Sequence, residues 1–215
     1  EKKLRKRYAV CQRLMHYEQE RKYIFLMPYR LIIGEILNFA GVLLLTGIHI
    51  PFFLDTIGTV AVTFYAGLVP GLTVALLFNV LRTLQVALMS GTQVYPWEML
   101  YMLCGVAIAA VTWAFARKKE NFRINRIITC LYLMLIAFCQ HSLPALIGGV
   151  VEACNRILFY GVQNKSPAEY FIRAFLGENF GLFVSCVIAR IPMTVMDRII
   201  CTFAGYGLYR LAKRR

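Results

Sequence analysis

The chain has 215 residues, 59% of which are apolar, and a formal net charge of +13 at pH 7. Soluble domains are about 45–50% apolar, and a soluble domain of this length has too little core to bury the excess. A helix that faces lipid can be apolar around its whole circumference. The composition therefore excludes an ordinary soluble domain and predicts an all-α, polytopic integral membrane helix bundle.

The positive charge is concentrated in three patches that flank apolar runs. Residues 1–30 hold nine Lys and Arg residues, 117–126 hold five and 210–215 hold four, which is 18 of the 24 in the chain. Basic residues beside membrane spans favour the cytoplasmic side, and they also attract anionic lipid headgroups. We therefore expect a multi-pass protein of the cell (inner or plasma) membrane with both termini in the cytoplasm. The expected partners of this charge are membrane lipids, and not nucleic acid.

The amino-terminal segment and the remainder of the chain have different characters. Residues 1–28 are too charged to span a bilayer, and their pattern predicts a basic, amphipathic helix at the cytoplasmic surface. Residues 29–215 carry no repeat and no low-complexity linker, which indicates a single transmembrane helical domain.

The first half of this domain contains four apolar runs, which cover residues 29–50, 55–69, 71–89 and 99–116. Pro51 ends the first run, and Val69-Pro70-Gly71 marks a tight turn after the second, which is short. Counting crossings places the polar loop after the third run outside and Arg117 inside. The basic residues that begin at Arg117 independently favour the cytoplasm, so charge and span count agree.

The second half allows two span counts. A fifth span is expected at 124–142, and three helical candidates follow, at 144–161, 168–189 and 194–211. Because the C-terminus returns to the cytoplasm, an odd number of these candidates must cross, which gives six spans or eight. Glu152 and Arg156 make the first candidate a poor lipid-facing span, and it is expected to be a re-entrant or surface element. We expect six core transmembrane helices.

We take the polar residues within the apolar runs as the candidate site. A charge in hydrocarbon costs at least about 2.5–3.5 kcal/mol, so a charged residue there is expected to have a function or a partner. Asp55 begins the second run, and Asn79 and Arg82 share one face of the third. Arg82 and Asp55 are expected at similar depth, where they can pair, and Thr59 adds a hydroxyl nearby. One interpretation is an outer pocket that binds a small solute, and the other is a structural ion pair between packed helices.

Three further residues extend the candidate site at its outer side. Trp97 and Glu98 follow the loop after the third run. Aromatic residues there are typical of a headgroup belt, whereas a lid would use the Trp97 ring to stack on a ligand and Glu98 to accept a hydrogen bond. Glu152 shares a helix face with Asn155 and Arg156 and is partly paired on that face. Glu152 either lines the pocket or satisfies local polar groups, and we include it in the pocket.

Small residues recur at a spacing of four near the end of the chain, at Gly177, Gly181, Ser185 and Ala189. On a single helix they would form one stripe that lets two backbones approach closely. The predicted contact is either within the protein or with a partner subunit.

Enzyme signatures are absent from the sequence. It contains no HExxH, GxSxG, Walker A or GxGxxG motif, and its seven cysteines include no CxxC pair. We therefore expect neither catalysis nor a bound metal or cofactor, and any active transport must draw energy from a partner or an ion gradient.

Two groups of short motifs resemble one transporter family. The first group is PFFLDTIGT at 51–59, GLVPG at 67–71, and Asn79. The second group is GGV at 148–150, DRII at 197–200 and GYGLYR at 205–210. Together they resemble the substrate-binding S components of energy-coupling-factor vitamin transporters, over roughly residues 29–215.

The resemblance implies a six-helix protein that captures a vitamin-like nutrient from the outer side for ATP-driven uptake. Such a protein docks on a transmembrane coupling subunit that carries two ATPase subunits, and it topples in the membrane to release its cargo. The ligand is expected under outer loops near Asp55, Trp97 and Glu152. Gly34 and Asn38 occupy the spacing of the family's Ala-x-x-x-Ala docking face. The alternative function is a membrane sensor or anchor domain of a larger signalling protein.

Overall fold

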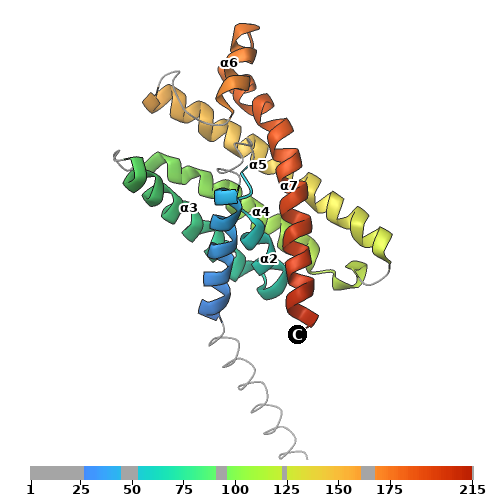
Figure 1. Ribbon diagram of the computed structural model, residues 1–215. Helices are drawn as coiled ribbons and strands as arrows, with labels where there is room; N and C mark the ends of the chain where they lie inside the picture. Colours follow the sequence, from blue (N-terminus) through green and yellow to red (C-terminus); the bar gives the residue numbers. More distant parts are fainter. Residues whose placement is uncertain (1–26, 45–52, 91–95, 123–124, 161–167, 215) are drawn as a thin grey trace, which may run out of the picture.

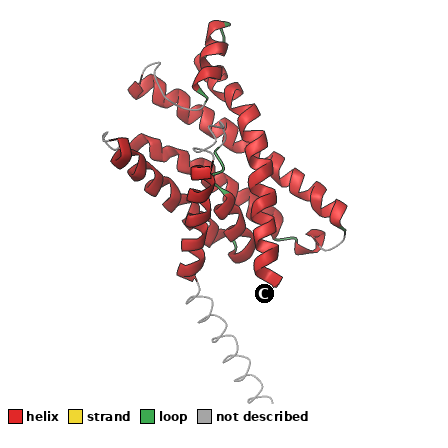
Figure 2. Cartoon of the chain, in the orientation of Figure 1, coloured by secondary structure: helices red, strands yellow, loops and turns green. Residues whose placement is uncertain are grey.

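The computed structural model describes residues 27–44, 53–90, 96–122, 125–160 and 168–214, and the structural statements below concern these residues. Their regular structure is entirely helical (Figure 2). The basic helix expected at 1–28 lies outside the described residues, except for its last two positions.

The helices form one bundle in which α7 is the longest element. Figure 1 shows α7 running from the end of the bundle that holds α6 to the C-terminus at the opposite end. The helices are Met27–Leu44, α2 (Ile57–Ala66), α3 (Leu68–Ser90), α4 (Met102–Ala116), α5 (Arg126–Asn155), α6 (Glu169–Gly177) and α7 (Leu182–Arg214). Three short helical elements complete the described helices: η1 (Pro96–Tyr101), η2 (Lys119–Phe122) and η3 (Arg156–Tyr160), a π-helical turn that continues α5.

Four helical segments are long and apolar enough to cross a membrane, namely Met27–Leu44, Leu68–Met89, Trp97–Ala116 and Arg126–Phe159. Their outward side chains are apolar as well. Leu88, Met89 and Ile157 expose 83%, 79% and 72% of their surface, a pattern that suits lipid better than water. These features support the expected membrane-embedded helical fold.

The region from residue 126 to 155 is one uninterrupted helix, α5, where two elements were expected. The re-entrant or surface element predicted at 144–161 is therefore the second half of the fifth helix and its π-helical extension. Pro144, the first residue of that predicted element, lies inside α5 and is buried. A proline removes one backbone hydrogen bond from a helix interior, and the buried packing around it supports the remaining turns.

The candidate helix at 168–189 is interrupted by a turn. Asn179 has a φ of 63°, a left-handed conformation that ends a helix, and it separates α6 from α7. Gly177 and Gly181 consequently lie on either side of this turn with open space beside them, whereas Ser185 and Ala189 are buried in α7. The four small residues do not form one stripe. The helical segment predicted at 194–211 is the C-terminal part of α7.

α5 and α7 approach each other closely at two glycines of α5. A Cβ atom at Gly149 would lie 2.5 Å from Cγ2 and 2.9 Å from Cα of Val187, and a Cβ atom at Gly148 would lie 2.8 Å from the Arg190 guanidinium. Glycine is therefore required at Gly149, where a side chain would meet the backbone of α7, whereas at Gly148 a side chain would displace the Arg190 guanidinium. This crossing brings the polar residues of α5 and α7 together.

We predict that Gly149→Ala destabilises the bundle by about 1–3 kcal/mol, because the added methyl group overpacks the α5–α7 crossing. The measurement is the thermal unfolding midpoint of the purified protein in detergent. Gly207→Ala is the matched control, since Gly207 lies on α7 with nothing within 4 Å of the added atom. Equal unfolding midpoints for the two variants would contradict the assigned crossing.

Candidate functional site

The chain segment that leads into α2 is held by charged side chains from α7. Asp197 accepts a hydrogen bond from the Leu54 backbone N–H at 2.6 Å, and it also pairs with its neighbour Arg198. Arg198 donates to the Thr56 hydroxyl at 2.7 Å and contacts Asp55 at 3.4 Å. Two carboxylates therefore share one guanidinium here. We call Leu54, Asp55, Thr56, Asp197 and Arg198 the α2-start cluster.

The first turn of α2 is held on its other side by the helix Met27–Leu44. The Asn38 carbonyl oxygen accepts hydrogen bonds from the backbone N–H groups of Gly58 at 2.7 Å and Thr59 at 3.3 Å. Its amide donates to the Thr59 hydroxyl at 3.1 Å. Free N–H groups at a helix start need such acceptors. Asn38 is therefore a buried capping residue for α2, and Thr59 is its partner within the bundle.

A second ionic group surrounds Glu152 on α5. One Glu152 carboxylate oxygen accepts hydrogen bonds from the Tyr101 hydroxyl and from Arg190 of α7, the latter at 3.0 Å. The other accepts one from Arg156 at 2.9 Å. Arg156 also pairs with Glu169 of α6. These five residues, the Glu152 cluster, join η1, α5, η3, α6 and α7.

The Glu152 cluster becomes more accessible toward α6. Glu152 and Arg156 are almost fully buried, whereas Glu169 is partly exposed and also pairs with the exposed Arg173 at 2.6 Å. Burial disfavours the charged form of Glu169, but hydrogen bonds from Arg156 and Arg173 outweigh this effect and hold its pKa below the ordinary value. The cluster therefore extends from the bundle interior to a charged rim on α6.

Neutral hydrogen bonds continue the polar face of α7 between and beyond the two clusters. Thr194 lies one turn from Arg190 and its hydroxyl is 2.7 Å from Nδ1 of His141. Thr202 donates to Gln140 at 2.9 Å, and Gln140 donates to Thr112 at 2.6 Å. Positions 190, 194, 198 and 202 repeat every four residues and therefore share one helix face.

Two buried arginines on this face retain donors without partners. Within the described residues, the Nε atoms of Arg190 and Arg198 make no hydrogen bond, and both side chains are more than nine-tenths buried. The two residues lie two turns apart, about 12 Å along the helix. A guanidinium is suited to a carboxylate or phosphate group because its planar donors match that geometry.

The structure separates the predicted site residues into two groups. Asp55 and Glu152 belong to the two ionic clusters, and the predicted pairing of Glu152 with Arg156 is confirmed. Arg82 does not pair with Asp55, because its guanidinium bonds to Gln85 on the same helix and Arg198 takes its place. Asn79 donates to the Ala75 carbonyl of its own helix.

Two of the predicted outer residues, Trp97 and Glu98, lie in η1. The last residue of η1, Tyr101, belongs to the Glu152 cluster. The Trp97 ring stacks on Phe159 with centroids 4.0 Å apart and an interplanar angle of 6°. Glu98 is partly buried in the same element.

Gly34 and Asn38 face α2 and α3 within the bundle, where a Cβ at Gly34 would meet Val74 at 2.9 Å. They form an internal packing face.

Sequence reasoning missed Tyr101, Arg190 and the pairing role of Asp197 and Arg198. The available signal was three charges within one apolar segment, with Asp197 and Arg198 seven and eight residues after Arg190. That spacing places them on one helix face. Their partners, however, lie on segments up to 143 residues away, which no local pattern identifies.

Comparisons with protein-family models, with curated proteins and with solved structures found no match for this chain.

We predict that Glu152→Ala destabilises the protein by about 3–5 kcal/mol, because it leaves Arg156 and Arg190 buried without their shared carboxylate. Arg173→Ala is the control. It removes an exposed ion pair to Glu169, and such pairs contribute about 0–1 kcal/mol. Unfolding in detergent, followed by loss of helical circular dichroism, measures both changes. Similar effects for the two variants would show that Glu152 is not the centre of the cluster.

Proposed function

We propose that the chain is the substrate-capture subunit, or S component, of an energy-coupling-factor transporter. In this role it binds a small, vitamin-like solute with an anionic group from the outer side, for ATP-driven uptake with partner subunits. The observation that carries the proposal is the pair of buried arginines, Arg190 and Arg198, whose Nε donors have no partner among the described residues. Ionisable residues inside a membrane bundle mark functional sites by default.

The proposal assigns six crossings to the helices Met27–Leu44, α2, α3, α4, α5 and α7. The charges of α7 are paired inside the bundle, which lowers the free-energy cost of placing them within the membrane. α2 has ten residues and is about 15 Å long, half of a hydrocarbon core of about 30 Å. Its non-helical lead-in completes the crossing, since such backbone is tolerated where protein covers it.

The basic patches orient the proposed crossings. The cations of α7 that follow Tyr209 lie near the C-terminus, which Figure 1 shows at the end opposite α6. The positive-inside rule then places the C-terminal end in the cytoplasm and α6 outside. The Glu152 cluster, whose rim is on α6, opens toward the side from which a capture subunit takes its solute.

The spatial arrangement of the motifs also supports the family assignment. The motif at 51–59 and the motif at 197–200 are far apart in sequence, yet Leu54, Asp55 and Thr56 contact Asp197 and Arg198 directly. The GGV motif provides the glycines at which α5 approaches α7. The motifs at 51–59, 148–150 and 197–200 therefore all lie at contacts between segments that are distant in sequence.

The chemistry of the clusters narrows the class of solute. Arg190 and Arg198 offer donors to a carboxylate or phosphate, while the partly exposed Asp55 offers an acceptor to an amine or hydroxyl group. Trp97, in η1, provides an aromatic surface on the ring face that is not stacked on Phe159. An amphipathic solute with one anionic group and one hydrogen-bond donor fits this combination, and the chain itself carries out no reaction on it.

We predict that Arg190→Lys and Arg198→Lys each lower solute binding at least tenfold, because lysine keeps the charge and loses the planar fork. Native mass spectrometry of the purified protein identifies the co-purified solute, and titration of that solute measures the change in Kd. Arg82→Lys is the matched control, since the described contact of the Arg82 guanidinium is a hydrogen bond to Gln85 of its own helix. A binding loss confined to Arg82→Lys would overturn the assigned site.

Partnership is tested separately from solute binding. Affinity purification of the tagged full chain from its native membranes is expected to recover a transmembrane coupling subunit and ATPase subunits. Solute binding without recovery of either partner would favour the alternative function, a sensor or anchor domain, over the transporter.

A further inference from the structure

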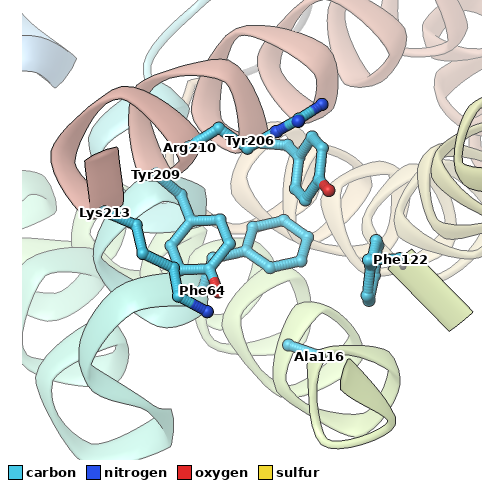
Figure 3. Close-up of a pocket in the computed structure, with 7 residues that line it drawn as sticks. All are labelled: Phe64, Ala116, Phe122, Tyr206, Tyr209, Arg210 and Lys213. Carbon is cyan, nitrogen blue, oxygen red and sulfur yellow. The ribbon is translucent and has the colours of Figure 1, made fainter. Parts of the chain in front are cut away.

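A cavity of about 170 Å³ lies at the C-terminal end of the bundle, away from both ionic clusters. Figure 3 shows α7 on one side of it and residues of α2, α4 and η2 on the other. Its lining residues are Phe64, Ala116, Phe122, Tyr206, Tyr209, Arg210 and Lys213. None of them is part of the proposed solute site.

The floor and walls of this cavity are aromatic. Phe64 packs against Phe122, Tyr206 and Tyr209, with ring centroids 5.4–5.9 Å apart. Phe122 and Tyr206 are stacked at 5.2 Å. Phe64 and Tyr206 are buried, and Ala116 contributes the smallest side chain of the lining. The contacts among the rings hold this part of the cavity in one shape.

The rim of the cavity is cationic. Arg210 and Lys213 are exposed on successive turns of α7, and the Lys213 amine lies 5.9 Å from the centroid of the Tyr209 ring. The described residues that line the cavity include no carboxylate. An occupant must therefore combine an anionic group at the rim with a compact, largely apolar group inside.

We propose that this cavity binds the headgroup region of an anionic phospholipid from the cytoplasmic leaflet. A cavity of about 150 Å³ accommodates a benzene-sized molecule, so this one holds a short apolar stretch of one acyl chain next to the glycerol backbone, while the phosphate lies at the cationic rim and the rest of both chains remains in the bilayer. Basic pockets between transmembrane helices on the cytoplasmic side are suited to anionic headgroups, and the basic patches of the chain place this end of the bundle on that side.

The position of the cavity gives the lipid a mechanical role. Its lining joins α2 to α7 through Phe64 and the two tyrosines, and it joins α4 to both through Ala116. A bound headgroup links the C-terminal ends of α2, α4 and α7, on the cytoplasmic side of the ionic clusters. The bound lipid thus stabilises the cytoplasmic end of the bundle independently of solute binding.

The test is a lipid titration of the purified full chain in a neutral detergent, followed by native mass spectrometry. Short-chain phosphatidylglycerol is expected to bind at least tenfold more tightly than phosphatidylcholine of the same chain length. Arg210→Ala/Lys213→Ala is expected to abolish this preference by removing the cationic rim. Ala116→Leu is expected to reduce phosphatidylglycerol binding by filling the cavity while both cations remain.

Lys118→Ala/Arg126→Ala is the matched control, because it removes two exposed cations that do not line the cavity. Retention of the preference in this variant supports the site, and an equal loss in the control and the rim variant overturns it in favour of nonspecific charge attraction. Equal binding of the two lipids also overturns it. Displacement of bound phosphatidylglycerol by millimolar inorganic phosphate would assign the cavity to a free anion instead of a lipid.

Discussion

The structure depends on hydrogen bonds to the non-helical backbone that leads into α2. Protein side chains, and not water, must provide these hydrogen bonds. Leu54 has a φ of 39° and its N–H is bonded to Asp197, while the first N–H groups of α2 are bonded to Asn38. Unpaired backbone groups inside an apolar bundle cost several kcal/mol each. One carboxylate and one amide therefore fix the helix Met27–Leu44, α2 and α7 relative to one another.

The charge that satisfies this backbone in turn requires partners of its own. Asp197 is balanced by Arg198, and two turns earlier on the same face Arg190 is balanced by Glu152. Gly148 and Gly149 make the second pairing possible, because they let α5 approach α7 closely enough for hydrogen bonds. Removing one member of such a buried pair is far more destabilising than replacing the whole pair by apolar groups. The pairs therefore specify the arrangement of the helices more than they stabilise it.

The two ends of the bundle differ in chemistry. The end at α6 carries a charged cluster whose rim is partly exposed, whereas the C-terminal end carries an aromatic cavity with a cationic rim. The first arrangement suits a small polar solute, and the second suits a headgroup attached to a membrane. The two proposals therefore assign solute recognition to one end of the bundle and lipid binding to the other.

The sequence by itself determined the helical class and most of the helices, because the length and apolar character of each run are local properties. α3 and α4 lie within three residues of their predicted bounds, and the first helix begins within two residues of its predicted start, while its predicted end at residue 50 lies outside the described residues. Only the tertiary structure decided that Pro144 lies inside a helix, that Asn179 divides the predicted segment at 168–189, and that Asp55 pairs with Arg198 instead of Arg82. These outcomes depend on packing between segments distant in sequence, which determines whether a proline is tolerated and which of two arginines reaches a buried carboxylate.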